Sequence, residues 1–168
     1  MKTVNHTQTL KSFTLKSLVV AIAAYSLSPH DALGGPSGGV VVGGTGTITQ
    51  AGTETRIDQR TDRLSLEWDS FNVGTTERVE FVQPGADSIA LNRILDSSGS
   101  QILGRIDANG QVILMNPNGV FFGEDAVVDV GGLVASGLNI HTDDFMNGEL
   151  LFSALDGTSG TVINHGLI

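Results

Sequence analysis

Short apolar runs, separated by turn-forming residues, recur along most of this chain. In one of them Leu64, Leu66 and Trp68 alternate with polar neighbours, a period of two that is typical of β-strands. Clusters of Gly, Pro, Asn and Ser interrupt the runs about every 8–12 residues, as tight turns do. Only residues 142–155 have weak helical character. The pattern therefore predicts a chain that is nearly all β.

Several runs are apolar on both faces, whereas strands of sandwiches and barrels usually have one polar face. They read VILM at 112–115, VFF at 120–122, AVV at 126–128 and GLVA at 132–135. With dense Gly and Asn at the turns and few charges, such runs favour a β-solenoid, a parallel β-helix. We expect the side chains of 112–115 and 120–122 to point largely into the stack. A β-sandwich is the structural alternative.

Spaced sequence echoes resemble degenerate turns of a solenoid, although no clean numerical period connects them. They are GGTGTITQAG at 43–52, GRIDANGQVIL at 104–114 and GTVINHGLI at 160–168. The sequence ends inside the last echo, without a polar cap. Because an uncapped solenoid end leaves an open strand edge, we expect the β-helix to be truncated at its C-terminal end.

Residues 1–32 differ in composition from the rest. They hold all three lysines of the chain and none of its 22 glycines. A basic stretch followed by a short apolar run at 17–27 is typical of a secretory signal peptide, which the Sec export machinery would handle. We expect cleavage near Ala32, which leaves 33–168 as the mature domain. A buried N-terminal helix is the alternative.

The charge and the cysteine count restrict the possible partners. The mature region carries 6 basic and 17 acidic residues, a net charge of −11. Such a chain is a poor electrostatic match for nucleic acid, so we expect no nucleic-acid partner. The absence of cysteine excludes disulfides, thiol catalysis and thiolate metal sites.

Catalytic signatures are largely missing from the sequence, and we expect neither an enzyme nor a cofactor. His141 and His165 are most simply loop and turn residues rather than metal ligands. The many carboxylates are scattered, and their default role is solubility. A β-helical polysaccharide lyase or hydrolase would need carboxylates converging with Arg or Lys on one face. A carbohydrate-binding β module would need an exposed aromatic platform.

The most restrictive local pattern is the turn Asn116-Pro117-Asn118-Gly119, between the runs 112–115 and 120–122. Proline presets φ at the second turn position, and Asn accepts a backbone hydrogen bond that initiates the turn. Asn118 and Gly119 suit the bridge and left-handed conformations that follow. All four residues therefore have sufficient structural reasons, while none offers reactive chemistry.

Two further pairs have specific structural expectations. Asn92-Arg93 lies between apolar residues, so one polar side chain should point inward and the other outward. The inward one must be hydrogen-bonded. Trp68 and Phe71 are most simply core aromatics.

Five motifs in order resemble the two-partner secretion domain, the N-terminal haemagglutination-activity domain of filamentous-haemagglutinin-like exoproteins. They are EWDSFNVG, VEFVQP, ALNRIL, SQILGRIDANGQVILMNPNGVFFG and VDVGGLVASGL. The resemblance covers about 36–168 and implies a right-handed parallel β-helix. Asn116 to Gly119 match the family's Asn-Pro-Asn-Gly motif, and Asn92-Arg93 matches a frequent pair. The Asn-Pro-Asn-Leu motif of one subgroup is absent, and the residues around Trp68 and Phe71 resemble the adhesin-like branch.

The resemblance implies a function in protein export from a Gram-negative bacterium. The domain would be recognised by an outer-membrane transporter of the Omp85 type, through its periplasmic POTRA modules, and would then nucleate folding of a secreted or cell-surface passenger. The passenger would carry the effector activity and any host-surface ligand. The sequence leaves open whether that activity is adhesion, haem scavenging, cytolysis or toxin delivery.

Overall fold

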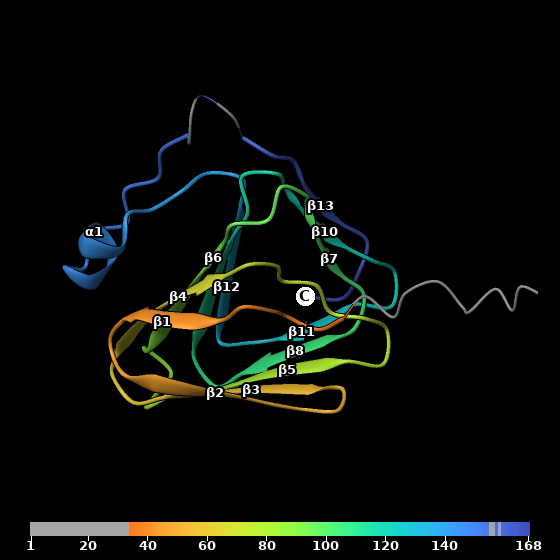
Figure 1. Ribbon diagram of the computed structural model, residues 1–168, viewed down its shortest axis with the longest axis horizontal. Coiled ribbons are helices and arrows are strands. Elements are labelled where there is room, and N and C mark those ends of the chain that lie inside the picture. The colour runs from red at the N-terminus through yellow and green to blue at the C-terminus, as the bar shows by residue number, and fades with distance from the viewer. Residues whose placement is uncertain (1–33, 155–156, 158) are drawn as a thin grey trace, which may run out of the picture. The chain divides into compact units, whose positions relative to one another are not determined.

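The chain coils as a three-sided parallel β-helix in a computed structural model that describes residues 34–154, 157 and 159–168. The expected signal peptide falls outside these residues. Successive turns of the coil stack their strands into three sheets, which form the three sides in Figure 1. Among the described residues, no helix is both long and apolar enough to cross a membrane.

We name the three sheets A, B and C. In the parallel part of the coil the chain passes through them in that order. Sheet A consists of β2 (Gly46–Ala51), β3 (Glu54–Gln59), β5 (Arg78–Val82), β8 (Arg105–Ala108) and β11 (Val127–Asp129). Sheet B consists of β1 (Val40–Gly43), β4 (Arg63–Trp68), β6 (Ile89–Ile94), β9 (Gln111–Met115) and β12 (Gly132–Ser136). Sheet C consists of β7 (Ser100–Ile102), β10 (Val120–Phe122) and β13 (Val162–Asn164). The fold is the parallel β-helix that the apolar pattern favoured, with the right-handed coil that the family resemblance implied.

The strand register explains why no clean period is visible in the sequence. Val79 aligns with Ile106 and Ile106 with Val128, which are steps of 27 and 22 residues. Val120 aligns with Val162, a step of 42 residues, because the chain leaves the coil after β12 and forms the helix α1 (Thr142–Met146) before it returns. Turn length therefore varies while the register inside each sheet is kept.

The N-terminal strands depart from the parallel pattern. β1 pairs antiparallel with β4, and β2 pairs antiparallel with β3. The stretch 43–52, whose sequence suggests a degenerate turn, is therefore not one. A two-residue loop with Gly52 at φ +59° sends the chain straight back along β2, as in a hairpin. The parallel turns begin at β3, and the antiparallel strands cover the N-terminal end of sheets A and B.

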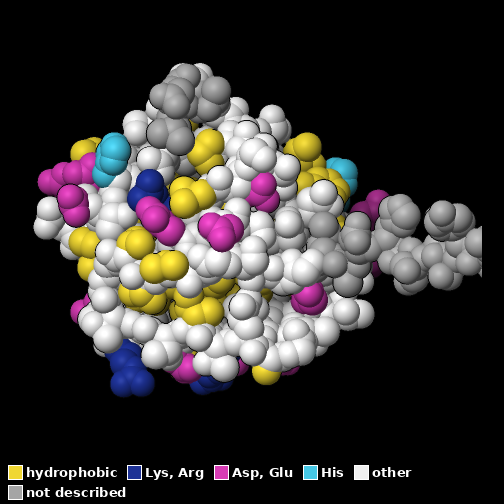
Figure 2. All heavy atoms as spheres, in the orientation of Figure 1, with side chains coloured by type: hydrophobic (Ala, Val, Ile, Leu, Met, Phe, Trp, Pro, Cys, Tyr) yellow, Lys and Arg dark blue, Asp and Glu magenta, His cyan; other side chains and the backbone are white. Residues whose placement is uncertain are grey.

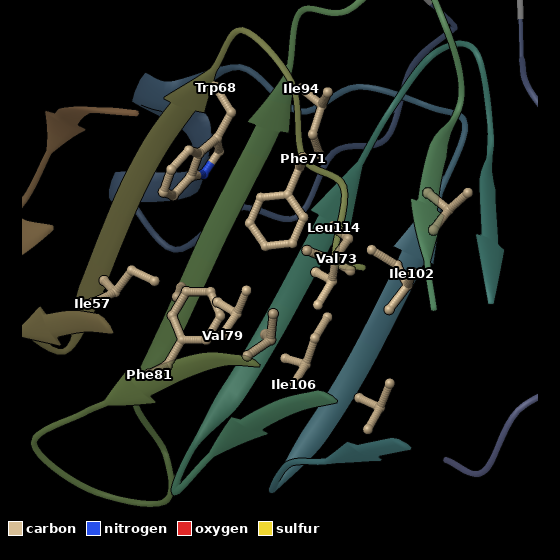
Figure 3. Packing of buried hydrophobic residues seen from close by; sticks show 14 of the residues in the cluster. Ile57, Trp68, Phe71, Val73, Val79, Phe81, Ile94, Ile102, Ile106 and Leu114 are labelled. Carbon is tan, nitrogen blue, oxygen red and sulfur yellow. The ribbon is translucent and has the colours of Figure 1, made fainter. Parts of the chain in front are cut away.

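The interior is filled by columns of aligned side chains, seen from close by in Figure 3. Leu64, Ala90 and Val112 form one such column across sheet B. Trp68 and Phe71 are buried in the same core, with ring centroids 5.3 Å apart in an edge-to-face pair. Edge-to-face contact suits the opposite charges of aromatic rims and faces.

The run 112–115 is buried on both sides, but not in the way that was expected. Val112 and Leu114 point into the coil. Ile113 and Met115 point outward and are buried in a second cluster with Phe145 of α1. The expectation that the whole run points largely into the stack is therefore wrong for half of it. The apolar character of both faces reflects a second layer outside sheet B.

Candidate functional site

The turn Asn116 to Gly119 forms the corner between β9 on sheet B and β10 on sheet C. Gly119 N donates to Asn116 O at 2.8 Å, which closes the turn. Asn118 N donates to Asn116 Oδ1 at 2.9 Å. Gly119 has φ +103°, and a Cβ there would lie 2.6 Å from the Thr161 carbonyl oxygen. The corner therefore needs glycine for its conformation and also for the close approach of the next turn.

Asn116 ties this corner to the turns of the coil on both sides. Its side chain is fully buried, and Nδ2 donates to Ser98 O at 2.9 Å and to Ser100 Oγ at 3.0 Å in the preceding turn. Its backbone N donates to Ser136 O at 3.0 Å in the following turn. Because each side-chain atom has an internal partner, Asn116 has little left to offer a second protein.

Pro117 and Asn118 are the parts of the corner that solvent reaches. Asn118 is exposed and Pro117 is half-buried. Asn118 Nδ2 donates to Asp96 O at 2.7 Å, so this side chain also holds the preceding corner. Beside the turn lies an open groove of about 520 Å³, whose lining residues include Asn118, Gly119, Phe121 and Ile163. A partner that contacts the corner would meet this uncharged groove.

Asn92 and Arg93 point to opposite sides of sheet B, as the alternation predicted. Asn92 is fully buried, accepts a hydrogen bond from Trp68 Nε1 at 3.0 Å and donates to Ile113 O at 3.2 Å. Arg93 forms an outward salt bridge to Glu67 at 2.8 Å. The pair lies beside the turn on the neighbouring strand, because Arg93 is in register with Met115, which directly precedes Asn116. Asn92 anchors the core tryptophan, and Arg93 extends outward from sheet B.

The structure leaves the histidines as turn and loop residues. In the described part of the chain, no group of three His, Cys, Asp or Glu side chains could hold a metal ion. His165 packs edge-on against Phe121, with ring centroids 5.6 Å apart. His141 precedes α1 and makes no side-chain cap to it.

The carboxylates are not all scattered, and this is what reasoning from the sequence missed. Three arginines and five carboxylates form a charge ladder on the outer face of sheet A, namely Arg56, Arg78, Arg105, Glu54, Asp58, Glu80, Asp107 and Asp129. In Figure 2 basic and acidic side chains lie together along the lower edge, where β2, β3 and β5 lie in Figure 1. The available signal was the recurring pattern Arg, apolar, acid in β3, β5 and β8.

Asp107 lies at the centre of this charge ladder. Burial by itself would raise its pKa, but hydrogen bonds and positive charge from Arg105 and Arg78 outweigh burial and lower the pKa below its ordinary value. A general acid needs a raised pKa, as one of the two carboxyl groups of a glycosidase has. The convergence of acids and arginines here therefore forms an ion-pair network and does not favour the lyase or hydrolase alternative.

Comparisons with known proteins agree with this geometry. The model of a family described as "TPS secretion domain" matches residues 34–168. The crystal structure of the HMW1 secretion domain from Haemophilus influenzae has a TM-score of 0.74 and 35% identity, over 79% of this chain and 36% of that one. A heme/hemopexin-binding protein of H. influenzae strain Rd is 43% identical over 101 residues, which are 60% of this chain. Another H. influenzae heme/hemopexin-binding protein is 37% identical over 115 residues, which are 68% of this chain.

This chain spans only a small part of those relatives, 11% and 12% of their lengths. The matched region contains the turn at 116–119, the buried Asn92 and the aromatic pair Trp68 and Phe71, all held by one β-helix. The match of the family model to residues 34–168, together with the shared fold, shows that the chain belongs to the TPS secretion domain family.

Proposed function

We propose that the turn at 116–119 is what a cognate outer-membrane transporter reads in this chain, through the shape that the turn gives to its corner. Members of this family are secretion modules of exported exoproteins, which are secreted or surface-associated and have such a transporter as partner. The observation that carries the proposal is the clamping of Asn116 between the preceding and following turns. This clamp supports recognition of the corner's shape, because only Pro117 and Asn118 of the four turn residues are accessible to a partner.

We further propose the route and the machinery. Residues 1–32 direct the chain through Sec into the periplasm and are removed near Ala32. The transporter is of the Omp85 type and first meets the domain with its POTRA modules. The β-helix then nucleates folding of the passenger outside the cell. For the whole protein we propose an adhesin- or haemagglutinin-like passenger, and the heme/hemopexin-binding relatives make haem acquisition the second candidate.

A reporter experiment tests this function. The full chain, fused ahead of a reporter that does not cross the outer membrane by itself, is expressed with and without the cognate transporter. We expect the reporter in the medium or on the cell surface only when both are present. Intact mass of the exported species should show a start near residue 33. A reporter that stays in the periplasm despite the transporter, or a product that retains residues 1–32, would contradict the proposal.

A further inference from the structure

A segment of the chain leaves the coil between β12 and β13 and runs back across the outside of sheet B. We name residues 137–153 the strap. It contains α1, which lies outside sheet B in Figure 1. Met146 at the end of α1 reaches β1, where a Cβ on Gly43 would lie 3.0 Å from its Cγ. Phe145 is fully buried beneath the guanidinium of Arg63, 5.3 Å from the ring centroid.

Other strap contacts cover the strands between these ends. Thr142 Oγ1 lies 3.3 Å from Ser65 Oγ and accepts from Arg93 Nη1 at 3.1 Å. Arg93 Nε donates to Asn139 Oδ1 at 3.2 Å. Apolar contacts involve one buried cluster, namely Leu91, Ile113, Met115, Ile140 and Phe145. One short segment therefore touches β1 and three successive turns of the coil.

This arrangement is unusual for a solenoid. Its turns normally contact only their neighbours, so the ends are coupled only through the turns between them. The strap provides a direct connection, because it leaves from β12 and docks on β1 and β4, at the opposite end of sheet B. Ser65 and Thr142 are 77 positions apart in the sequence.

The helix of the strap is too short to be stable by itself. α1 has five residues and no side-chain cap at its N-terminus. Isolated helices this short are unstable in water, so α1 depends on its buried face. Two backbone hydrogen bonds between Asn139 and Ser153, of 2.8 and 2.9 Å, close the strap on itself. The form of α1 therefore depends on its contacts with sheet B.

We propose that the strap is a latch that joins the two ends of sheet B, from β1 and β4 to β12, into one cooperative unit once the chain through Met146 has docked. Arg93 is its polar anchor on sheet B. This inference goes beyond the proposed function, because it involves no transporter. Its tests use the purified chain alone, so its failure is distinguishable from failure of the secretion proposal.

The first test is Phe145→Ala in the full chain, followed by hydrogen exchange and denaturant unfolding. Phe152→Ala is the matched control, because Phe152 lies in the strap but is 38% exposed. We expect Phe145→Ala to lose amide protection in β1 and β4 as well as in the strap, and to broaden the unfolding transition. The control should leave both unchanged. Faster exchange confined to residues 137–153, with a transition as sharp as that of the wild type, would overturn the proposal.

A second variant covers the case in which Phe145→Ala does not fold. Ser65→Cys with Thr142→Cys places two thiols where the hydroxyls are 3.3 Å apart, in a chain that has no cysteine. We expect a disulfide that raises the denaturant midpoint, and a lower midpoint when the same variant is reduced. Failure of the two thiols to join, or equal midpoints in the oxidised and reduced forms, would contradict a docked latch.

Discussion

Two polar regions link neighbouring turns of this β-helix, and they do so by opposite means. At the corner 116–119 the link is a neutral amide, Asn116, which is completely buried and bonded to the turns on both sides. On sheet A the link is the charge ladder, in which the Arg56 side chain is 45% exposed and that of Arg105 43%. Water is excluded from Asn116, whereas the charged groups of the ladder remain partly hydrated.

The difference shows which of the two regions fixes the backbone. A buried amide that loses its partner leaves donors and acceptors that water cannot reach, at about 1–3 kcal/mol each. Exposed ion pairs are replaced by hydration at little net cost. We therefore expect the corner to determine local structure, and the charge ladder to add a small, pH-dependent contribution to stability.

The largest effect should come from Gly119→Val, which attacks the corner directly. A β-branched residue would be strained at φ +103°, and its Cβ would lie 2.6 Å from the Thr161 carbonyl oxygen. We expect a loss of about 2–4 kcal/mol in the free energy of unfolding, measured from denaturant midpoints. Gly85→Val is the control, because no atom lies within 4 Å of a Cβ there. Equal losses of unfolding free energy in the two variants would show that the corner does not determine the local structure.

Asn116→Ala should have the next largest effect. It removes hydrogen bonds to Ser98 O, Ser100 Oγ and Asn118 N at a buried site. We expect a loss of about 2–3 kcal/mol. Asn118→Ala removes one exposed hydrogen bond and should cost about 0.5 kcal/mol. If the two variants unfold at the same denaturant concentration, the buried clamp is not what holds the corner.

Asp107→Asn tests how much the charge ladder contributes to stability. Its folded pKa is lowered, so the carboxylate contributes stability above the ordinary carboxyl pKa of about 3.9 and loses it as the pH falls through the lower folded value. We expect the variant to lose about 1 kcal/mol at pH 7 and to converge with the wild type in acid. Arg56→Gln, at the exposed end of the charge ladder, should leave the midpoint unchanged. A pH-independent loss for Asp107→Asn would show that the ion pairs are not its cause.

Much of the fold could be predicted because period-two alternation and turn residues are local signals. The nearly all-β character and the opposite directions of Asn92 and Arg93 followed from them, whereas the parallel coil was favoured by runs that are apolar on both faces. The outward burial of Ile113 and Met115 could not be predicted in this way, since its cause is α1, which the chain adds later. The antiparallel β2 was missed because a hairpin strand and a solenoid strand have the same pattern. The charge ladder could not be predicted without the strand register between turns. The varying length of the turns conceals that register in the sequence.

The candidate site was predictable in part for the same reason. The four residues at 116–119 encode their own turn, so its conformation could be expected from sequence alone. The clamp on Ser98 and Ser100 joins positions up to 18 residues apart and depends on how the turns stack. Local sequence identifies the turn, whereas stacking determines which of its side chains remain available to a partner.

The central claim is that the corner acts in secretion through its shape. Secreted yield with the cognate transporter, measured beside denaturant midpoints, tests it most directly in three variants. They are Asn116→Ala, Asn118→Ala and, as a control with an intact corner, Val79→Ala, which should lose about 2 kcal/mol from the fully buried core of sheet A. We predict that secretion falls strongly for Asn116→Ala alone. Loss of secretion in Asn118→Ala at a wild-type midpoint would make the turn a direct contact site, and equal losses in Asn116→Ala and Val79→Ala would reduce its role to overall stability.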